Sequence, residues 1–371
     1  MSELWVSDPG AGFEAVRSEL VEAFEEVLDS GRYILGEQVT RFEAEWAARC
    51  ETSHAIGVSS GTDALALALR AVGVEPGDEV LVPAMTAVAT WAAVSQIGAI
   101  PIAVDIEPDR NGMDPHAARD ALNDRTRAIV AVHLFGCPAD LGELGSLASA
   151  AGIALVEDAA QAHGARLGGR TVGSIGAVAA FSFYPTKNLA AMGDAGAVTT
   201  SDAESADRLQ LLREYGWRKR DEAEMQGVNA RIDELQAAIL RVMLGRLDLA
   251  NQTRREIATS YLDGLADAPG LELPAVVDDS EPVWHQFVVR HPQRDALAGA
   301  LASAGVGTAV HYASLPPLNV AYSGNRWRRG MFPVAERHAA QALSLPAHPA
   351  LRPDDVARVI EAVRVSCRDL A

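Results

Sequence analysis

One lysine stands in surroundings that a surface lysine does not need. Residues 180–197 read AFSFYPTKNLAAMGDAGA and place Lys187 between a Pro-Thr pair and an asparagine, with apolar or small residues on both sides. Such flanks disfavour a solvated lysine, and a buried ammonium group is costly unless its charge is removed or paired. A lysine amine loses its charge when it condenses with an aldehyde to form a Schiff base, so Lys187 is a candidate nucleophile.

Two further stretches supply groups that an aldehyde-bearing cofactor would need. Gly61 and Thr62 in SSGTDALALAL open a predicted helix, whose free amides and dipole favour a phosphate, provided that Asp63 points away. Asp158 ends the apolar run IALVEDAA, where it fits either a ligand contact or the N-cap of a following helix. Together with Lys187 these groups match pyridoxal 5′-phosphate, because a carboxylate against the pyridine nitrogen keeps the ring an electron sink.

A sheet must position these groups, and the sequence predicts one. Near-continuous apolar runs, typical of strands buried on both faces, alternate with helical patterns. Strands are expected at 79–84, 100–106, 128–136, 153–160, 179–185 and 196–201, and helices at 62–73, 114–123 and 139–152. This alternation predicts an α/β domain, in which the loops at the carboxyl ends of parallel strands collect functional residues.

The pattern changes after residue 230. Residues 231–265 have long helical periodicity without proline and predict one connecting helix. The remainder predicts a smaller α+β part, with strands at 284–291 and 308–313 and helices at 294–305, 334–343 and 353–368. We therefore expect a large domain over residues 1–245, including an N-terminal arm, and a small domain over residues 246–371.

Composition narrows the class of partner. The 371-residue chain carries a net charge of −18, which disfavours nucleic acid, although WRKR (217–220) and NRWRRG (325–330) could each hold a small anion or be solvated loops. No apolar run reaches the roughly 18 residues that span a bilayer. No signal-peptide pattern is visible, so we expect a cytoplasmic protein without a membrane partner. The three cysteines lack metal-ligand spacing, and we expect no metal site.

The order of these motifs resembles the DegT/DnrJ/EryC1/StrS family of pyridoxal-phosphate-dependent sugar aminotransferases. The similarity runs over nearly the whole chain and includes SGRYILGEQVTRFEAEWA (30–47), SSGTDALALAL, VEDAAQAHGA, FSFYPTKN, GDAGAVTT, NARIDELQAA and FPVAERHAAQALSLP (332–346). The resemblance implies the type I, aspartate-aminotransferase-like α/β fold, with a mainly parallel sheet in the large domain and a smaller C-terminal α+β domain. It also implies a homodimer with shared active sites.

The resemblance further implies a role for each matching residue. Lys187 would form the Schiff base with the cofactor, and Asp158 would contact the pyridine nitrogen. The other cofactor contacts would come from Gly61, Thr62, Gln161 and Ser182, and from Asn229 of the neighbouring subunit. Substrate contacts would come from Tyr33, Tyr184, Arg218, Lys219, Arg231, His311 and Tyr312.

Substrate and donor are implied by the same resemblance. Family substrates are usually nucleotide-linked keto-deoxysugars, or keto-cyclitols in one branch, and the amino donor is usually glutamate or glutamine. We expect a dTDP-linked keto-deoxyhexose aminated at C-3 or C-4, in the biosynthesis of a natural product or surface glycan, with a keto-cyclitol as the alternative. The diphosphate would need cations, for which the candidates are Arg218, Lys219, Arg326, Arg328 and Arg329.

Three other functions are disfavoured. A pyridoxamine-dependent sugar dehydratase typically has histidine where this chain has Lys187. A non-catalytic regulatory homologue would not need the intact set of lysine, aspartate and phosphate-binding residues. A nicotinamide oxidoreductase would need a G-x-G-x-x-G sequence after the first strand, which is missing here.

Two positions depart from the family pattern. Many members carry a ring-stacking aromatic residue after the threonine of PAMTAVATWAAV (83–94), where this chain has Ala87. Trp91 follows four residues later, and we expect it to pack in the next helix rather than on the cofactor. Many relatives read HYP-x-P-x-H near residue 311, whereas this chain reads HYASLPPLNVAY, which weakens any transfer of sugar identity.

Overall fold

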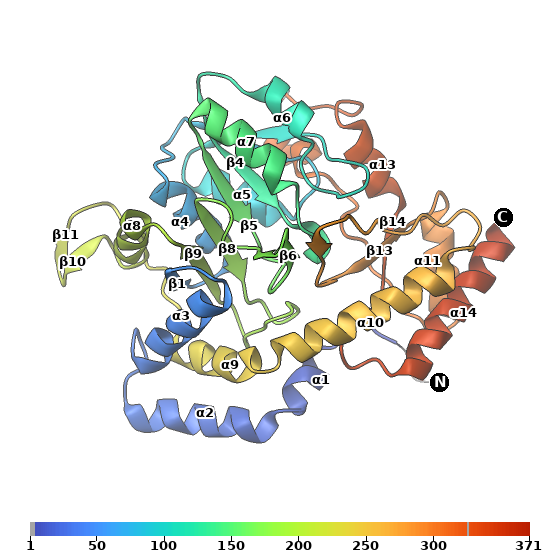
Figure 1. The fold of residues 1–371 in the computed structure, drawn as a ribbon, viewed down its shortest axis with the longest axis horizontal. Helices are drawn as coiled ribbons and strands as arrows, with labels where there is room; N and C mark the ends of the chain where they lie inside the picture. Colours follow the sequence, from blue (N-terminus) through green and yellow to red (C-terminus); the bar gives the residue numbers. More distant parts are fainter. Residues whose placement is uncertain (1–3, 325) are drawn as a thin grey trace.

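A seven-stranded sheet forms the centre of the molecule. The computed structural model describes residues 4–324 and 326–371, so Asn325 of the second basic cluster lies outside the described residues. The strand order is β1-β9-β8-β5-β4-β2-β3 (Figure 1). The strands are β1 (His54–Val58), β2 (Glu79–Pro83), β3 (Ile100–Val104), β4 (Thr126–Val132), β5 (Ala154–Asp158), β8 (Val178–Ser182) and β9 (Gly196–Thr200). Within this sheet β9 runs antiparallel to both neighbours, so the carboxyl ends of the other six strands lie at one edge.

Both faces of the sheet are buried, which explains the continuous apolar runs. In β2, Val80 and Val82 join the hydrophobic core on one face, whereas Leu81 joins a core on the other. The first face is covered by α4 (Gly61–Ala71), α5 (Val88–Gln96) and α8 (Ala203–Arg213). The opposite face is covered by α3 (Glu37–Arg49), α6 (Pro115–Ala121), α7 (Leu141–Ala151) and α9 (Glu234–Leu244). The mainly parallel α/β sheet that the sequence predicts is confirmed.

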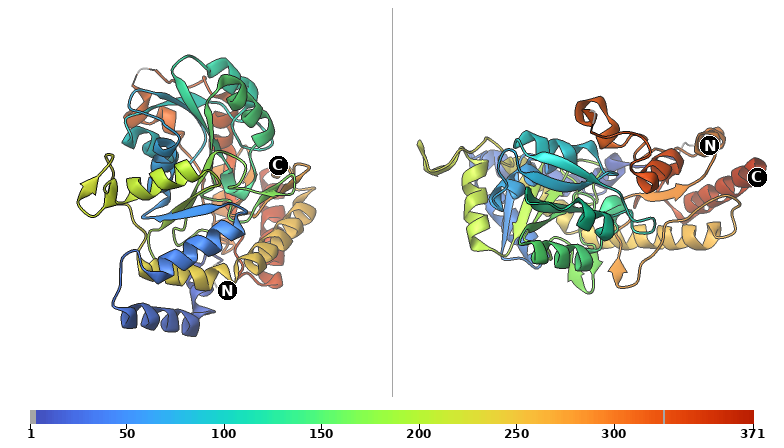
Figure 2. Two further views of the ribbon diagram at one scale, coloured as in Figure 1. Left: turned by 60° about the vertical axis from the view of Figure 1, so that its left-hand side comes forward. Right: turned by 90° about the horizontal axis from the view of Figure 1, so that it is seen from above.

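The N-terminal segment wraps around α9. It forms α1 (Pro9–Glu14) and α2 (Arg17–Ser30), and α2 packs along α9 at the outside of the molecule (Figures 1 and 2). The first turn of α3 has no capping side chain of its own. Instead, buried Glu234 accepts hydrogen bonds from the backbone amides of Gly36, Gln38 and Val39 at 2.6–3.0 Å, and so joins α9 to α3.

The single helix predicted over residues 231–265 is wrong in one respect, because it consists of two helices. α9 ends at Leu244, and α10 (Leu247–Leu265) begins after two intervening residues. The break falls at Gly245 and Arg246, where glycine has a low helix propensity. From there α10 runs away from the sheet toward the C-terminal part of the chain (Figure 1).

The C-terminal part is built on an antiparallel pair of strands, β13 (Phe287–Arg290) and β14 (Ala342–Leu345). Helices α11 (Arg294–Ser303), α13 (Pro333–Gln341) and α14 (Pro353–Leu370) confirm the predicted helices. A short helix, α12 (Val320–Ser323), lies between α11 and α13. The domain boundary at residues 245 and 246 stays a prediction.

The strand predicted at 308–313 is wrong. This segment makes one isolated bridge, between Ala309 and Ser344, and does not continue as a strand. The reason lies in tertiary contacts: His311 uses its side chain to bond Ser344, and Tyr312 bonds Gln161 beside the sheet. The strand that pairs with β13 is β14, whose first residues were predicted to end the helix at 334–343.

Two small elements complete the described chain. β10 (Trp217–Lys219) and β11 (Glu222–Ala223) form a hairpin that projects from one end of the molecule (Figures 1 and 2). β6 (Arg166–Leu167), β7 (Arg170–Thr171) and β12 (Ser280–Glu281) form a separate three-stranded sheet. Within the described residues, no helix combines the length and the apolar character that crossing a membrane requires.

Candidate active site

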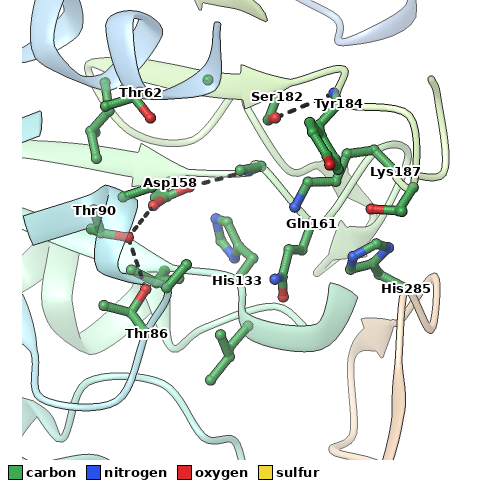
Figure 3. Close-up of a pocket in the computed structure, with 18 of the residues that line it drawn as sticks. Thr62, Thr86, Thr90, His133, Asp158, Gln161, Ser182, Tyr184, Lys187 and His285 are labelled. Carbon is green, nitrogen blue, oxygen red and sulfur yellow. Dashed lines mark hydrogen bonds between the residues drawn. The ribbon is translucent and has the colours of Figure 1, made fainter. Parts of the chain in front are cut away.

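A cavity of about 390 Å³ opens at the carboxyl edge of the sheet (Figure 3). Its wall is built from the start of α4, from the loops after β2, β4, β5 and β8, and from two segments of the C-terminal part, residues 285–286 and 311–312. Lys187, Asp158, Gln161 and Ser182 all line this cavity, although 29 positions separate the first two in the sequence. The sheet therefore brings together the residues that sequence reasoning selected.

One end of the cavity is suited to a phosphate. Gly61 and Thr62 begin α4, and among the described residues their backbone amides have no acceptor. A Cβ atom on Gly61 would lie 2.4 Å from Ser182 Cβ, so the helix start approaches the end of β8 as closely as glycine permits. Free amides at a helix N-terminus, with the Thr62 and Ser182 hydroxyls beside them, form a site for an anion.

The nearest carboxylate is held away from this anion site, as the sequence analysis requires. Asp63 Oδ2 accepts hydrogen bonds from Ser59 Oγ at 2.6 Å and from Ser60 Oγ at 2.9 Å. Asp63 Oδ1 accepts from Gln96 Nε2 at 3.3 Å. Asp63 is not among the residues that line the cavity, so its charge does not face a phosphate there.

Asp158 is fixed by two donors at the cavity wall. Thr90 Oγ1 donates to Asp158 Oδ2 at 2.8 Å, and the Ala160 amide donates to Oδ1 at 3.2 Å. Burial raises the pKa of Asp158, while the hydrogen bond from Thr90 and the charge of Lys187 act in the opposite direction. No helix follows β5 directly, so the alternative interpretation of Asp158 as an N-cap is wrong.

Two threonines of this arrangement were missed by the sequence analysis. Thr86 and Thr90 are both buried, and their hydroxyls lie 2.8 Å apart, so that they form a chain leading to Asp158 (Figure 3). The signal that could have found them is their spacing. Threonines at positions i and i+4, where a strand gives way to a helix, present both hydroxyls on one side.

Lys187 lies in a turn after β8 and points into the cavity (Figure 3). Its backbone amide donates to the Tyr184 carbonyl at 2.8 Å. Burial lowers the pKa of Lys187 to about 8, although the negative charge of Asp158 opposes this effect. No carboxylate of the described residues lies within 4.0 Å of Nζ. A partly deprotonated, unpaired amine in a polar cavity is a nucleophile, and this answers why the sequence surrounds Lys187 with apolar and small residues.

Gln161 links the cavity wall to the C-terminal part. Its Oε1 accepts from the Phe135 amide at 2.6 Å, and its Nε2 donates to Tyr312 Oη at 3.0 Å. Both bonds fix the amide plane at the wall of the cavity. Tyr312 and His311, two of the predicted substrate residues, therefore line the same cavity as the predicted cofactor residues.

A fully buried hydrogen-bond network begins at His133, which lines the cavity. His133 Nδ1 accepts from the Ala139 amide at 3.0 Å, so the ring proton is on Nε2, which faces Glu157 Oε2 at 3.1 Å. Glu157 also accepts from the amides of Gly173, Ile175 and Gly176 at 2.6–2.8 Å. Burial alone raises the pKa of Glu157, but its hydrogen bonds outweigh this effect and hold the pKa below the usual value. Glu157 and Asp158 thus have different surroundings, because successive residues of a strand face opposite sides of the sheet. Glu157 bonds His133 and three backbone amides, whereas Asp158 lies at the wall of the cavity.

The position of the expected ring-stacking residue carries no aromatic group. Ala87 lines the cavity just before α5. Trp91 is buried in the core, donates from Nε1 to the Pro83 carbonyl at 3.2 Å and packs edge-on against Tyr322. As expected, Trp91 packs within its helix and does not line the cavity.

Several predicted residues lie outside this cavity within the single chain. Tyr33 is 53% exposed, Asn229 is exposed, and Arg231 pairs with Glu214 at 3.3 Å and lies over the Tyr215 ring. Tyr184 is also exposed but does line the cavity.

The two basic clusters are also placed away from the cavity. Arg218 and Lys219 belong to the β10–β11 hairpin, where Arg218 pairs with Asp207 and Glu224 and Lys219 lies 3.4 Å from Glu222. Hydrogen bonds with these two acids raise the pKa of Arg218. Arg326 lies 3.8 Å from Glu79, the first residue of β2, which is the edge of the sheet opposite to Asp158. Within one chain, therefore, the structure does not bring these cations to the cavity.

The expected absence of a metal site stays a prediction. All three cysteines are free, and Cys50 and Cys367 are buried. In the described residues, no group of three or more His, Cys, Asp or Glu side chains could hold a metal ion.

The chemistry of the donor set fits pyridoxal 5′-phosphate. The free amides at the start of α4 would hold the phosphate, Asp158 would face the pyridine nitrogen, and Lys187 would face the aldehyde. The fold, with an aldehyde-reactive lysine and a carboxylate at the carboxyl edge of a mainly parallel sheet, is that of the type I pyridoxal-phosphate enzymes.

Comparison with known proteins gives the family. The model of the DegT/DnrJ/EryC1/StrS aminotransferase family matches residues 14–364, and the chain belongs to this family. The chain is 50% identical over 357 residues to the dTDP-3-amino-3,4,6-trideoxy-α-D-glucose transaminase of Streptomyces venezuelae, covering 96% of this chain and 94% of the relative. It is 44% identical over 347 residues to the dTDP-3-amino-3,6-dideoxy-α-D-galactopyranose transaminase of Aneurinibacillus thermoaerophilus, covering 94% and 95%.

A solved structure confirms the fold. The crystal structure of S. venezuelae DesV in complex with a ketimine intermediate superposes with a TM-score of 0.97 at 49% identity, covering 99% of each chain. The protein is therefore a pyridoxal-phosphate-dependent aminotransferase with the type I fold that the sequence predicts.

Proposed function

We propose that this aminotransferase moves the amino group of glutamate or glutamine to C-3 of a dTDP-linked 3-keto-deoxyhexose, in the biosynthesis of an amino-deoxysugar. The observation that carries the proposal is the meeting of Lys187 and Asp158 in one cavity, in a chain 50% identical to a transaminase named for a 3-amino sugar. C-3 is preferred over C-4 because both relatives described above are named for 3-amino sugars. A keto-cyclitol acceptor is the alternative, and a cytoplasmic location stays a prediction.

Lys187 has two tasks in this proposal. When bound, pyridoxal phosphate supplies an aldehyde that condenses with amines and a ring that accepts electrons. Lys187 Nζ would hold the cofactor through its aldehyde and, once the amine of the donor has taken that place, would take the proton from the α-carbon of the donor. A pKa of about 8 leaves part of the amine unprotonated near neutral pH, as a general base requires.

Asp158 supplies a fixed negative charge for the same step. Its two donors, the Thr90 hydroxyl and the Ala160 amide, hold the carboxylate in one orientation at the cavity wall. A carboxylate so placed stabilises a protonated ring nitrogen, and thereby the negative charge that leaves the α-carbon. Tyr184, His311 and Tyr312, which line the rest of the cavity, are the proposed contacts of the sugar.

The homodimer is also part of the proposal. Large apolar side chains are exposed on and beside α2, including Phe24 (48%), Leu28 (54%) and Met192 (55%), and Phe24 and Met192 line one groove. Monomeric proteins rarely expose contiguous apolar patches of this kind, so a second copy is proposed to cover them. In this arrangement Tyr33, Asn229, Arg231 and the β10–β11 hairpin of one subunit complete the site of the other.

A mixing experiment tests the shared site. Lys187→Ala and Asn229→Ala each damage the active site, but through different subunits if the site is shared. Mixed heterodimers then contain one intact site and recover activity that neither variant has alone. Mixtures that stay as inactive as the separate variants contradict the shared site.

The proposed reaction is tested by absorbance of the purified holoenzyme before and after addition of glutamate or glutamine. Loss of the visible cofactor band with a gain in the near-ultraviolet shows transfer to the cofactor, and Lys187→Ala is the control that should not respond. The aminated enzyme is then offered a 3-keto sugar nucleotide, its 4-keto isomer and a keto-cyclitol. Amination of the 4-keto sugar or the cyclitol in preference to the 3-keto sugar would refute the proposed acceptor.

A further inference from the structure

A second, smaller cavity lies directly beside the active-site cavity. It has a volume of about 150 Å³. Thr186, His285, Gln286 and His311 line both cavities, so the two share a wall. The far side of the smaller cavity is formed in part by Arg254 of α10 and by Ser7 of the N-terminal segment.

Arg254 is a buried arginine without an acidic partner. It is 7% exposed, and no carboxylate of the described residues lies within 4.0 Å of its guanidinium group. One nitrogen, Nη1, donates to the backbone carbonyls of Trp284, His285 and Ala347. Nε is buried without a hydrogen-bond partner, and Nη2 likewise has none in the described part of the chain. Nη2 is therefore the nitrogen left for a ligand, because the surface of Nε is fully covered by the protein.

The charges around Arg254 favour an anion. Burial lowers the pKa of Arg254 to about 10, which still leaves the group charged at neutral pH. Lys187 adds a second positive charge nearby, whereas burial lowers the pKa values of His285 and His311 and keeps both rings neutral. Asp8 lines a common groove with Arg254, but it is an exposed residue whose Oδ1 already accepts from the Ala11 amide. A buried arginine left without compensation is costly, and an anion with two oxygens would remove that cost.

The size of the cavity selects the kind of anion. A volume of about 150 Å³ accommodates a molecule of roughly the size of benzene. The smaller cavity is therefore too small for a nucleotide diphosphate sugar but admits a carboxylate on a short carbon chain. Arg254 also lines a groove of about 420 Å³ together with Thr186 and Lys187, and the size argument concerns the smaller cavity alone. We propose that Arg254, through Nη2, binds a carboxylate of the amino-acid donor in this second cavity. The inference rests on the proposed function, because it takes glutamate or glutamine as the donor.

The donor can reach both places at once. Thr186 precedes Lys187 in the chain and lines both cavities. An amino acid whose amine faces Lys187 therefore has a carboxylate within a few bonds of the shared wall. Glutamate and glutamine both carry an α-carboxylate, whereas only glutamate carries a second one. The two donors thus distinguish which carboxylate Arg254 holds.

The first test measures binding without turnover. Glutarate, a five-carbon dicarboxylate that lacks an amine, is titrated calorimetrically into the holoenzyme. Arg254→Gln should weaken glutarate binding about 10- to 100-fold, because it removes charge-assisted hydrogen bonds, and Arg254→Lys should have an intermediate effect. Wild-type affinity in Arg254→Gln would overturn the proposal. If Arg254→Gln does not fold, wild-type enzyme is titrated with 1,5-pentanediol. Binding as tight as that of glutarate would then overturn it.

The second test separates the two half-reactions. Arg254→Gln should raise the donor concentration that half-saturates the first half-reaction, for both donors if the α-carboxylate is bound and for glutamate alone if the second carboxylate is bound. The reaction of the aminated enzyme with the sugar nucleotide should be unchanged. A rise in KM for the sugar nucleotide alone would overturn the assignment.

Arg294→Gln is the matched control. Arg294 is also largely buried and also donates to two backbone carbonyls, those of Ala339 and Ala342, but it pairs with Asp295 and lines neither cavity. The Arg294→Gln variant should be less stable than wild type but should bind glutarate with the same affinity. If wild-type enzyme fails to react with either donor, the proposed function fails, while the glutarate titration still decides the role of Arg254.

Discussion

The hydrogen bond from Thr90 to Asp158 offers a sharp test of how the site works. Thr90 is 2% exposed, and its Oγ1 donates to Asp158 Oδ2 at 2.8 Å. Replacement by valine nearly keeps the shape of the side chain but removes the hydroxyl, and with it the donor to Asp158 and the partner of Thr86 Oγ1. The carboxylate then loses its side-chain donor and keeps the Ala160 amide alone.

The size of the effect follows from this geometry. A hydrogen bond to a charged group is worth about 1.5–3 kcal/mol. If all of it is expressed in the transition state, Thr90→Val slows the first half-reaction about 10- to 150-fold. The pKa of Asp158 should also rise, because burial already raises it and the Thr90 hydrogen bond is the largest opposing influence. The carboxylate is then protonated at a higher pH, and the acidic limb of the pH–rate profile shifts to higher pH.

The assay is the single-turnover rate with saturating glutamate or glutamine, measured across pH by absorbance. Two controls match the variant. Thr90→Ser keeps the hydroxyl and should retain most of the rate. Thr86→Val removes the hydroxyl that lies 2.8 Å from Thr90 but touches no oxygen of Asp158, so its effect should be smaller. A Thr90→Val enzyme with the rate and pH profile of wild type would refute the role assigned to Asp158 and its donor.

Two further substitutions test the frame of the site. Gly61→Ala should weaken binding of pyridoxal phosphate to the apoenzyme, because the added Cβ would meet Ser182 Cβ at 2.4 Å and displace the start of α4. The control is Gly12→Ala, whose added Cβ would meet nothing within 4 Å, and this variant should bind the cofactor as wild type does. Equal affinities in a cofactor titration would argue against the phosphate cradle. Glu157→Gln should cost roughly 1–3 kcal/mol for each donor left unsatisfied, measured by denaturant unfolding. Because hydrogen bonds lower the folded-state pKa of Glu157, its stabilisation is complete above the unfolded pKa and is lost as the pH falls through the folded value. If the free energy of unfolding of Glu157→Gln falls with decreasing pH as steeply as that of wild type, the assignment is wrong.

The sequence predicts the site best where a reactive residue stands at the end of a strand or the start of a helix. Lys187, Asp158 and Gly61 each stand at the end of an apolar strand or at the start of a helix, and parallel strands carry such ends to one edge. Their proximity can be predicted from alternation alone. The same pattern predicts α6 and α7, since local propensity and burial agree there.

Non-local contacts were beyond the reach of the sequence. Glu234 closes the N-terminus of α3 from 195 to 198 positions away, so no local pattern signals its role. The segment 308–313 has the apolar residues of a strand, but side-chain bonds of His311 and Tyr312 turn it toward the cavity. Arg326 reads as a cation for a diphosphate, yet the chain carries it to Glu79 at the opposite edge of the sheet. In each case tertiary contacts override the local pattern.

The residue after Lys187 shows how distant segments fix the surroundings of the lysine. Asn188 Nδ2 donates to Asn251 Oδ1 and to the Val283 carbonyl, both at 2.9 Å. Asn188 Oδ1 lies 3.1 Å from His285 Nδ1. A backbone carbonyl can only accept, so the nitrogen of Asn188 must face Val283 and its oxygen must accept from His285.

This orientation determines the tautomer of His285. The ring proton is on Nδ1, and burial, together with the charges of Lys187 and Arg254, lowers the pKa of His285 so that the ring stays neutral. Nε2 is therefore an acceptor on a ring that lines both cavities. An acceptor repels a carboxylate but binds a hydroxyl or an ammonium group. The smaller cavity thus presents an acceptor from His285 on the shared wall and an unpaired donor from Arg254 on the far side, which is the polarity that an amino acid, with one cationic and one anionic end, requires.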